Sequence, residues 1–125
     1  MLVSEQEILD LKEFIFQLNV IENSVVIVEG KRDSNALKKI GFTGKILEFH
    51  KFSGMVDFAD SVAKYERLVI LFDRDKKGRT LTGKAVQLLQ RRTNVDLTFK
   101  RKLRAITKGK IMFVEQLVSY ESHLG

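Results

Sequence analysis

The chain has 125 residues, of which 44% are hydrophobic and 30% are charged. This length and this balance are typical of one folded domain and argue against a disordered polar chain. The lack of cysteine excludes disulfides and thiolate sites, and two histidines are too few for a histidine-based metal cage.

The formal net charge of +6 is unevenly distributed. Residues 1–30 lean acidic, whereas residues 74–110 hold most of the lysine and arginine. Such a cluster indicates a protein that binds phosphate backbones, although a solvated basic surface explains it equally well. The acidic N-terminus does not resemble a secretory signal, and no apolar run approaches the roughly 20 residues of a membrane span. We therefore expect a cytoplasmic protein without membrane contact.

The first half of the chain predicts two helices and two strands. Ser4 and Glu7 form a capping-box pattern, and apolar residues at helical spacing then predict a helix over 4–18. The β-branched run 25–28 predicts a strand that is buried on both faces. A helix beginning at Asp33 or Ser34 and ending at Ile40 follows, and a second strand is predicted over 46–49.

The second half continues the alternation of strands and helices. We predict a helix over 55–64, strands over 68–72 and 95–99, and helices over 101–107 and 112–122. Between the last two strands, a helix after Gly78 carries Leu81, Ala85, Leu88 and Leu89 inward and ends with Arg91-Arg92. Strands that alternate with helices predict a compact Rossmann-like α/β fold, with a four-stranded, mainly parallel sheet and helices on both faces. In such sheets, ligands bind beyond the carboxyl ends of the strands.

Two of the predicted strands end at acidic residues. Glu29 directly follows the first strand and Asp73 the third, and Asp75 projects the same way as Asp73 from an extended segment. Each motif alone is weak, because a Glu-Gly pair is often a turn and an Asp-x-Asp pair often caps a helix. Together, the three carboxylates predict one site for Mg²⁺, with Mn²⁺ as a substitute.

The segments Val25–Asp33 and Leu68–Gly78 resemble the Toprim domain of topoisomerases, bacterial-type primases and several nucleases and recombination proteins. The resemblance covers roughly residues 24–100 by motif, and the whole chain is similar to the small stand-alone Toprim proteins of archaea. It implies a single Toprim domain over residues 1–125, with an N-terminal helix and C-terminal helices added to the core.

The resemblance implies that Glu29 is a general acid or base and that Asp73 and Asp75 hold Mg²⁺. Asp33 lies where the ribosomal-RNA maturation nucleases of the family have an aspartate, and the Ser53-Gly54 loop lies where they have a glycine-bearing loop. Four residues of the motifs are expected to have a structural role, namely Gly30, Asp33, Gly54 and Gly78. The nucleophilic tyrosine domain of topoisomerases and the zinc-binding module of primases have no counterpart here.

Basic residues flank both acidic loops, and we expect them to contact phosphates of nucleic acid or to serve as counter-charge for the acids. They are Lys31, Arg32, Arg74, Lys76, Lys77 and Arg79. A second basic run on a short helix comprises Lys100, Arg101, Lys102 and Arg104, for which a solvated helix face is at least as good an explanation.

The sequence favours a Mg²⁺-dependent nuclease that acts on RNA or DNA phosphodiesters. One alternative is a non-catalytic nucleic-acid-binding module or an accessory subunit of a larger nucleic-acid-processing complex. Another is a receiver-like phosphoacceptor, for which Asp73 fits and Lys100 is a poor match. The apolar C-terminal residues Met112, Val114, Leu117 and Val118 offer a face for internal packing, a homodimer or a protein partner.

Overall fold

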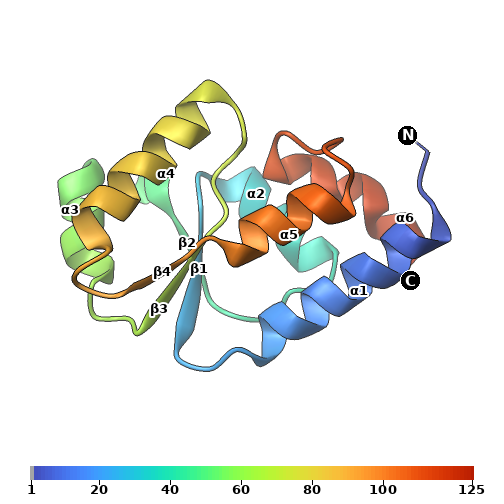
Figure 1. Cartoon of the computed structure of the whole chain (residues 1–125), viewed down its shortest axis with the longest axis horizontal. Coiled ribbons are helices and arrows are strands. Elements are labelled where there is room, and N and C mark those ends of the chain that lie inside the picture. Colours follow the sequence, from blue (N-terminus) through green and yellow to red (C-terminus); the bar gives the residue numbers. More distant parts are fainter. Residues whose placement is uncertain (1) are drawn as a thin grey trace.

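The computed structural model describes residues 2–125, which form a four-stranded sheet with helices on both faces (Figure 1). The strands are β1 (Ser24–Val28), β2 (Ile46–Glu48), β3 (Arg67–Ile70) and β4 (Asn94–Asp96). Their order is β2-β1-β3-β4, and every neighbouring pair is parallel. The predicted α/β fold is therefore confirmed.

The strand order reverses between β1 and β3. The chain passes from β1 to β2 on one side and then crosses to β3 on the other side of β1. The carboxyl ends of β1 and β3 are aligned, because Ile27 pairs with Ile70. In a doubly wound sheet, this reversal leaves a crevice between the loops that follow the two strands.

Side chains of β1 alternate between two hydrophobic clusters because successive residues of a strand point to opposite faces. Val26 and Val28 pack with α1 (Glu5–Val20), α2 (Lys31–Lys39), α5 (Thr98–Ile106) and the 3₁₀-helix η2 (Val114–Tyr120). Val25 and Ile27 pack with α3 (Met55–Val62) and α4 (Lys76–Leu89). The remaining elements are the 3₁₀-helix η1 (Phe49–Lys51) and α6 (Glu121–Leu124). No helix within residues 2–125 is long and apolar enough to cross a membrane.

Several element boundaries differ from those predicted, and two of the differences have a cause in local hydrogen bonds. The fourth strand ends at Asp96, because its carboxylate accepts hydrogen bonds from the Thr98 backbone (2.8 Å) and hydroxyl (2.6 Å) and so turns the chain into α5. The prediction that the strand reaches residue 99 is wrong, and Phe99 is a buried helical residue. Similarly, α2 begins at Lys31, since the Asp33 carboxylate accepts a hydrogen bond from the Gly30 amide (3.1 Å) and closes the first turn.

The C-terminal segment is a 3₁₀-helix followed by a short α-helix, rather than the predicted single helix over 112–122. Val114 and Leu117 are buried in the core, whereas Met112 and Val118 are exposed. Two of these four apolar side chains therefore cover α2 and the sheet.

A buried ionic group joins α1 to the C-terminal segment. The Glu7 carboxylate is 3% exposed, accepts hydrogen bonds from Lys110 Nζ at 2.8 and 2.9 Å, and accepts a third from the Tyr120 hydroxyl at 3.0 Å. The hydrogen bond from Lys110 is the main cause that lowers the pKa of Glu7, against the opposing effect of burial. The ionised carboxylate thus ties the two ends of the described chain together.

This group makes stability depend on pH. Since folding lowers the pKa of Glu7, its stabilisation is complete above the ordinary value of 4.5 and is lost as the pH falls through the folded value. We expect Glu7→Gln to lower the free energy of unfolding by about 2 kcal/mol at pH 7, with a smaller loss near pH 3. Urea unfolding from pH 7 to pH 3 measures this, with the exposed Glu13→Gln of the same helix as the control. An equal loss at every pH would contradict the assignment.

Candidate metal centre at the carboxyl ends of the strands

Glu29 and Asp73 meet where the two central strands end. Glu29 directly follows β1, and Asp73 follows the buried pair Leu71 and Phe72 beyond β3. The Asp73 backbone amide donates a 2.7 Å hydrogen bond to Glu29 Oε2. The two acidic residues, separated by 44 positions in the chain, are therefore brought into direct contact, as the parallel sheet predicts.

The side chain of Asp73 is also held by the C-terminal segment. Its Oδ1 accepts a 2.7 Å hydrogen bond from the backbone amide of Val114, at the start of η2. Lys100, in the first turn of α5, donates to the backbone carbonyls of Phe72 and Asp73. These contacts fix the loop after β3, so Asp73 presents its carboxylate from a rigid backbone.

Asp75 and Gly78 shape the entrance to α4. Asp75 is the N-cap of this helix, and its Oδ1 accepts a 2.8 Å hydrogen bond from the Gly78 amide. A Cβ atom on Gly78 would lie 1.9 Å from the backbone oxygen of Asp73. Glycine is thus required here by the close approach of the two backbones. The spacing of the Asp-x-Asp-x-x-Gly motif therefore has a local structural cause.

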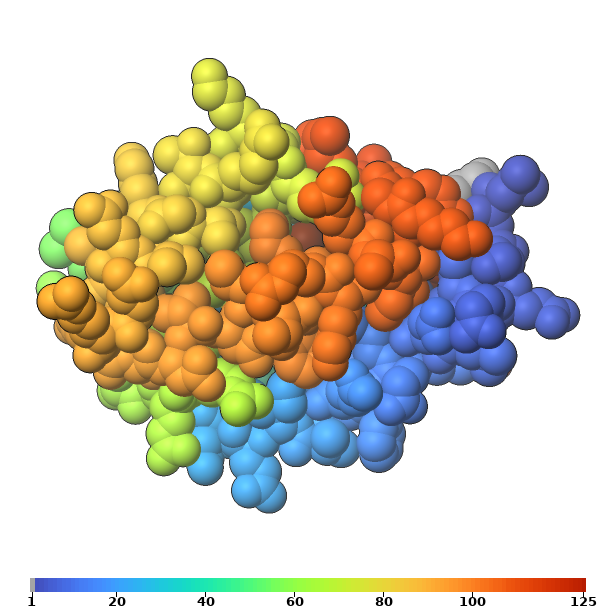
Figure 2. Space-filling model, in the orientation of Figure 1, coloured from blue at the N-terminus to red at the C-terminus, as the bar shows by residue number. Residues whose placement is uncertain are grey.

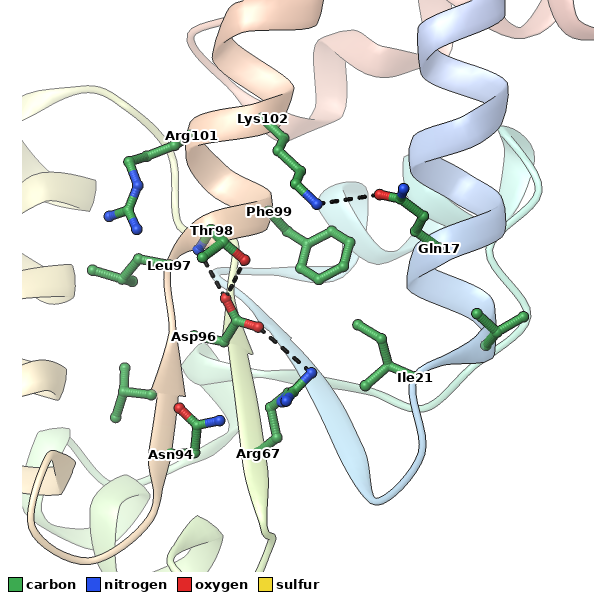
Figure 3. A pocket seen from close by; sticks show the side chains of 12 residues that line it. Gln17, Ile21, Arg67, Asn94, Asp96, Leu97, Thr98, Phe99, Arg101 and Lys102 are labelled. Atoms are coloured by element: carbon green, nitrogen blue, oxygen red, sulfur yellow. Dashed lines mark hydrogen bonds and ion pairs between the residues drawn. The ribbon is translucent and has the colours of Figure 1, made fainter.

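A pocket of about 400 Å³ opens over the acidic pair. The residues that line it are Glu29, Gly30, Lys31, Arg32, Asp33, His50, Asp73, Lys77 and Glu115. A larger cavity of about 730 Å³ lies between the end of α1 and the β4–α5 junction, where Arg67 pairs with Asp96 (Figure 3). That cavity is lined by none of the acids predicted as ligands. The chemistry of the carboxylates therefore points to the smaller pocket.

Two acids in this pocket have raised pKa values, chiefly because they are buried. Burial raises the pKa of Glu29 to about 7, and the negative charges of Asp73 and Asp75 add to this effect, while the hydrogen bond from the Asp73 amide opposes it. Burial, followed by the charge of Asp73, likewise raises the pKa of Asp33 to about 6. A bound cation would relieve the repulsion between these carboxylates.

The donor set fits a hard divalent cation, since carboxylate oxygens are the ligands that Mg²⁺ prefers. Within residues 2–125, however, no three carboxylate or imidazole groups are arranged as a ready-made cage. The structure assembles Glu29 and Asp73 as a pair and employs Asp75 as a helix cap. Mg²⁺ often keeps several waters and uses one or two carboxylates, so the pair is sufficient as a starting set of ligands.

The basic residues predicted to contact phosphates lie in three places. Lys31, Arg32 and Lys77 line the pocket over the acids, and Arg32 also lies 3.8 Å from Glu115. Lys76 is exposed at the start of α4. The others, Arg74 and Arg79, line a separate pocket on the side of α5.

The structural motif residues also have defined places. Gly30 precedes α2 and donates to Asp33, whereas Gly54 precedes α3 with a φ angle of 93°. This left-handed conformation favours glycine. Gly54 thus turns the chain from η1 into α3.

Glu115 and Lys100 also lie beside the acidic loop, and the sequence does not predict Glu115 there. Glu115 comes from η2, 42 positions after Asp73, and no local pattern predicts its return to the acidic loop. Lys100 belongs to the second basic run and is the poor match for the lysine of a receiver-like phosphoacceptor, but the structure places its amine against the carbonyls of Phe72 and Asp73. Burial lowers the pKa of its ammonium group, and the neighbouring acids oppose that shift. Its place beside Asp73 makes it part of the site.

Comparison with known proteins decides the family. The model of the Toprim domain matches residues 24–114. The chain belongs to the Toprim domain family. Toprim membership implies a metal-dependent function connected with nucleic acids, and Toprim domains typically bind a divalent metal ion.

The proteins that this chain is similar to include small archaeal UPF0292 proteins. A UPF0292 protein of Thermococcus sibiricus is 35% identical over 90% of this chain and 83% of its own length. A UPF0292 protein of Methanosarcina acetivorans is 32% identical over 96% of this chain and 81% of its own. A solved structure of a protein from Aquifex aeolicus is 30% identical, has a TM-score of 0.68 and covers 85% of this chain and 96% of its own. The predicted resemblance to stand-alone archaeal Toprim proteins is therefore confirmed.

Proposed function

We propose that this Toprim protein is a Mg²⁺-dependent nuclease that cleaves phosphodiesters of RNA or DNA. The observation that carries the proposal is the direct contact between Glu29 and Asp73 at the reversal of strand order. Two acids from different strands thus face one pocket, which has Lys31 and Lys77 at its rim. This combination gives a place for a cation and for the phosphate that it would neutralise.

Glu29 and Asp73, which line the pocket, would hold the metal ion, and Asp75, the N-cap of α4, would add negative charge beside them. When bound, Mg²⁺ supplies neutralisation of charge on the phosphodiester. The protein residues hold the surrounding geometry: Val114 and Lys100 fix the loop of Asp73, and Gly78 lets α4 begin beside it. Mn²⁺ accepts the same oxygen ligands and is expected to substitute.

Glu29 is assigned the transfer of a proton. Its pKa of about 7 lets the metal-free carboxyl group hold or release a proton near neutral pH. Its Oε2 accepts a hydrogen bond from the Asp73 amide, which orients the group toward the pocket. In this role, Glu29 takes a proton from the attacking water or gives one to the leaving oxygen. Lys31, Arg32 and Lys77 bind the flanking phosphates.

A second candidate is a Toprim module that binds nucleic acid without cleaving it. It is favoured by the engagement of Asp75 as the N-cap of α4, which leaves a pair of acids at the pocket rather than a preformed cage of three. Such a module would bind through Mg²⁺ and the basic loops. It would show salt-dependent affinity without turnover.

The two candidates are separated by incubation of the purified protein with structured RNA, single-stranded DNA and duplex DNA. Each substrate is tested with Mg²⁺, with Mn²⁺ and with EDTA. Cleavage that requires a divalent ion supports the nuclease and names its substrate. Binding to all substrates without any product supports the non-catalytic module instead.

A further inference from the structure

A second pocket, of about 210 Å³, lies between the start of α4 and the exposed side of α5. All of the residues that line it are basic: Arg74, Arg79, Lys100, Arg101 and Arg104. We call this site the arginine pocket. The space-filling view shows a recess where the yellow surface of α4 meets the orange surface of α5 (Figure 2).

The cations of the arginine pocket are not in ion-pair contact with any acid within residues 2–125. None of the five takes part in an ion pair in this part of the chain. Arg74 donates to the backbone carbonyl of Ile111 at 3.3 Å, and Lys100 donates to the carbonyls of Phe72 and Asp73. Backbone carbonyls therefore position two of the cations but do not neutralise them.

The helix geometry of α5 directs its arginines to this place. Arg101 and Arg104 are three positions apart and share one face of the helix. Arg101 points away from Lys102, which lies on the α1 side and donates to Gln17 (Figure 3). Arg79 comes from the first turn of α4, so the pocket draws its charge from two helices and the Asp73 loop.

Convergence of five like charges is electrostatically unfavourable in the absence of an anion. Arginine guanidinium groups match the oxygens of phosphate by paired hydrogen bonds, and Arg74, Arg79, Arg101 and Arg104 all present this group. The pocket is also continuous in the chain with the acidic site, since Arg74 lies between Asp73 and Asp75.

We propose that the arginine pocket holds a phosphate group of a nucleic-acid strand whose adjoining segment reaches Glu29 and Asp73. This assignment rests on the proposed action on nucleic acid and names where the strand runs: across the loop of Asp73 and between α4 and α5. The phosphate is either an internal diester or the monoester at the end of a strand. Both present the same oxygens to the arginines.

The test is a binding measurement in EDTA, where metal-dependent cleavage does not occur. Fluorescently labelled single strands that carry a 5′-phosphate, a 3′-phosphate or neither are titrated at several salt concentrations, with fluorescence anisotropy as the readout. We expect Arg101→Gln with Arg104→Gln to weaken binding roughly tenfold. The slope of log affinity against log salt should become shallower by about 1.4, since each contact with a single strand contributes about 0.7.

The matched control removes the same charge elsewhere. Lys39→Gln with Arg91→Gln changes two exposed residues near the far ends of α2 and α4. A loss confined to the pocket variant supports the proposal. If the loss depends on a terminal phosphate, the pocket takes a strand end; if it is equal for all strands, the pocket takes an internal diester. Equal losses in both variants, or no loss in the pocket variant, would overturn it.

Failure of this proposal can be told apart from failure of the proposed function. Cleavage that is unchanged by Glu29→Gln, with binding still weakened by the pocket variant, would remove the catalytic assignment and leave the phosphate site. Cleavage abolished by Glu29→Gln, with binding unchanged by the pocket variant, would do the reverse. The pocket variant and the control variant should both melt near the wild-type temperature. Such melting establishes that binding was compared between folded proteins.

Discussion

A Glu29→Gln variant is expected to lose metal-dependent cleavage by about 10²–10⁴-fold, because an amide cannot exchange the proton that the carboxyl group transfers. The amide oxygen can still accept the hydrogen bond from the Asp73 backbone, so the loop after β3 should stay in place. Initial cleavage rates on the substrate identified by the screen measure the effect. Circular dichroism checks the fold.

The control for this variant is Glu22→Gln, which removes the same charge from an exposed residue ahead of β1. Its cleavage rate should equal that of the wild-type protein. If Glu29→Gln cleaves as fast as the control does, Glu29 is not the group that moves the proton. We also expect Glu29→Gln to bind the uncleaved strand as tightly as the wild-type protein does, because the substitution leaves the basic residues in place.

Gly78→Ala is expected to lower the free energy of unfolding by roughly 3 kcal/mol, the upper part of the range for inserting atoms into a packed site. The added methyl group would stand 1.9 Å from the backbone oxygen of Asp73, so either α4 or the acidic loop must move. Metal-dependent cleavage should fall together with stability, because the displaced residue is the proposed ligand. Chemical denaturation gives the stability, and cleavage rates give the second readout.

The same helix provides a control of opposite sign. Gly83 lies within α4, and a Cβ atom there would meet nothing within 4 Å. Gly83→Ala should therefore stabilise the protein by up to about 1 kcal/mol through helix propensity alone. Similar effects of the two substitutions would mean that the contact of Gly78 with Asp73 does not hold the loop.

The placement of Glu29 and Asp73 could be predicted from the sequence because it depends on few physical facts. Continuous apolar runs predict buried parallel strands, and the carboxyl ends of parallel strands lie at one edge of the sheet. An acid directly after each run can therefore be placed at that edge, and the prediction requires no knowledge of its side-chain rotamer. The contact at 2.7 Å follows this expectation.

The role of Asp75 shows where such reasoning stops. An Asp-x-Asp pattern in an extended segment predicts two side chains on one side, but the helix begins at Lys76 and makes Asp75 its N-cap. The position of the helix start decides whether the second carboxylate faces the pocket or the amide of Gly78. Helix boundaries depend on caps and tertiary packing, which composition and periodicity resolve poorly.

The arginine pocket could not be predicted because its residues come from separate elements. Arg101 and Arg104 form a basic run that is typical of a solvated helix face, and only the pairing of β4 with β3 brings α5 beside the Asp73 loop. Glu115 reaches the acidic pocket in the same way, from a 3₁₀-helix that packs against α2. These contacts are set by long-range packing rather than by local sequence.

The most direct test of the acidic pair is the binding of Mg²⁺ or Mn²⁺ by the wild-type protein and by Glu29→Gln and Asp73→Asn. Calorimetric titration gives the affinity, and the rise in melting temperature with added metal gives an independent measure. The wild-type protein is expected to bind the metal ion, and each variant is expected to bind it at least about tenfold more weakly. The reason is that each variant removes one of the two carboxylates proposed to hold the ion. Equal affinity in all three proteins would contradict a shared metal site at the carboxyl ends of β1 and β3.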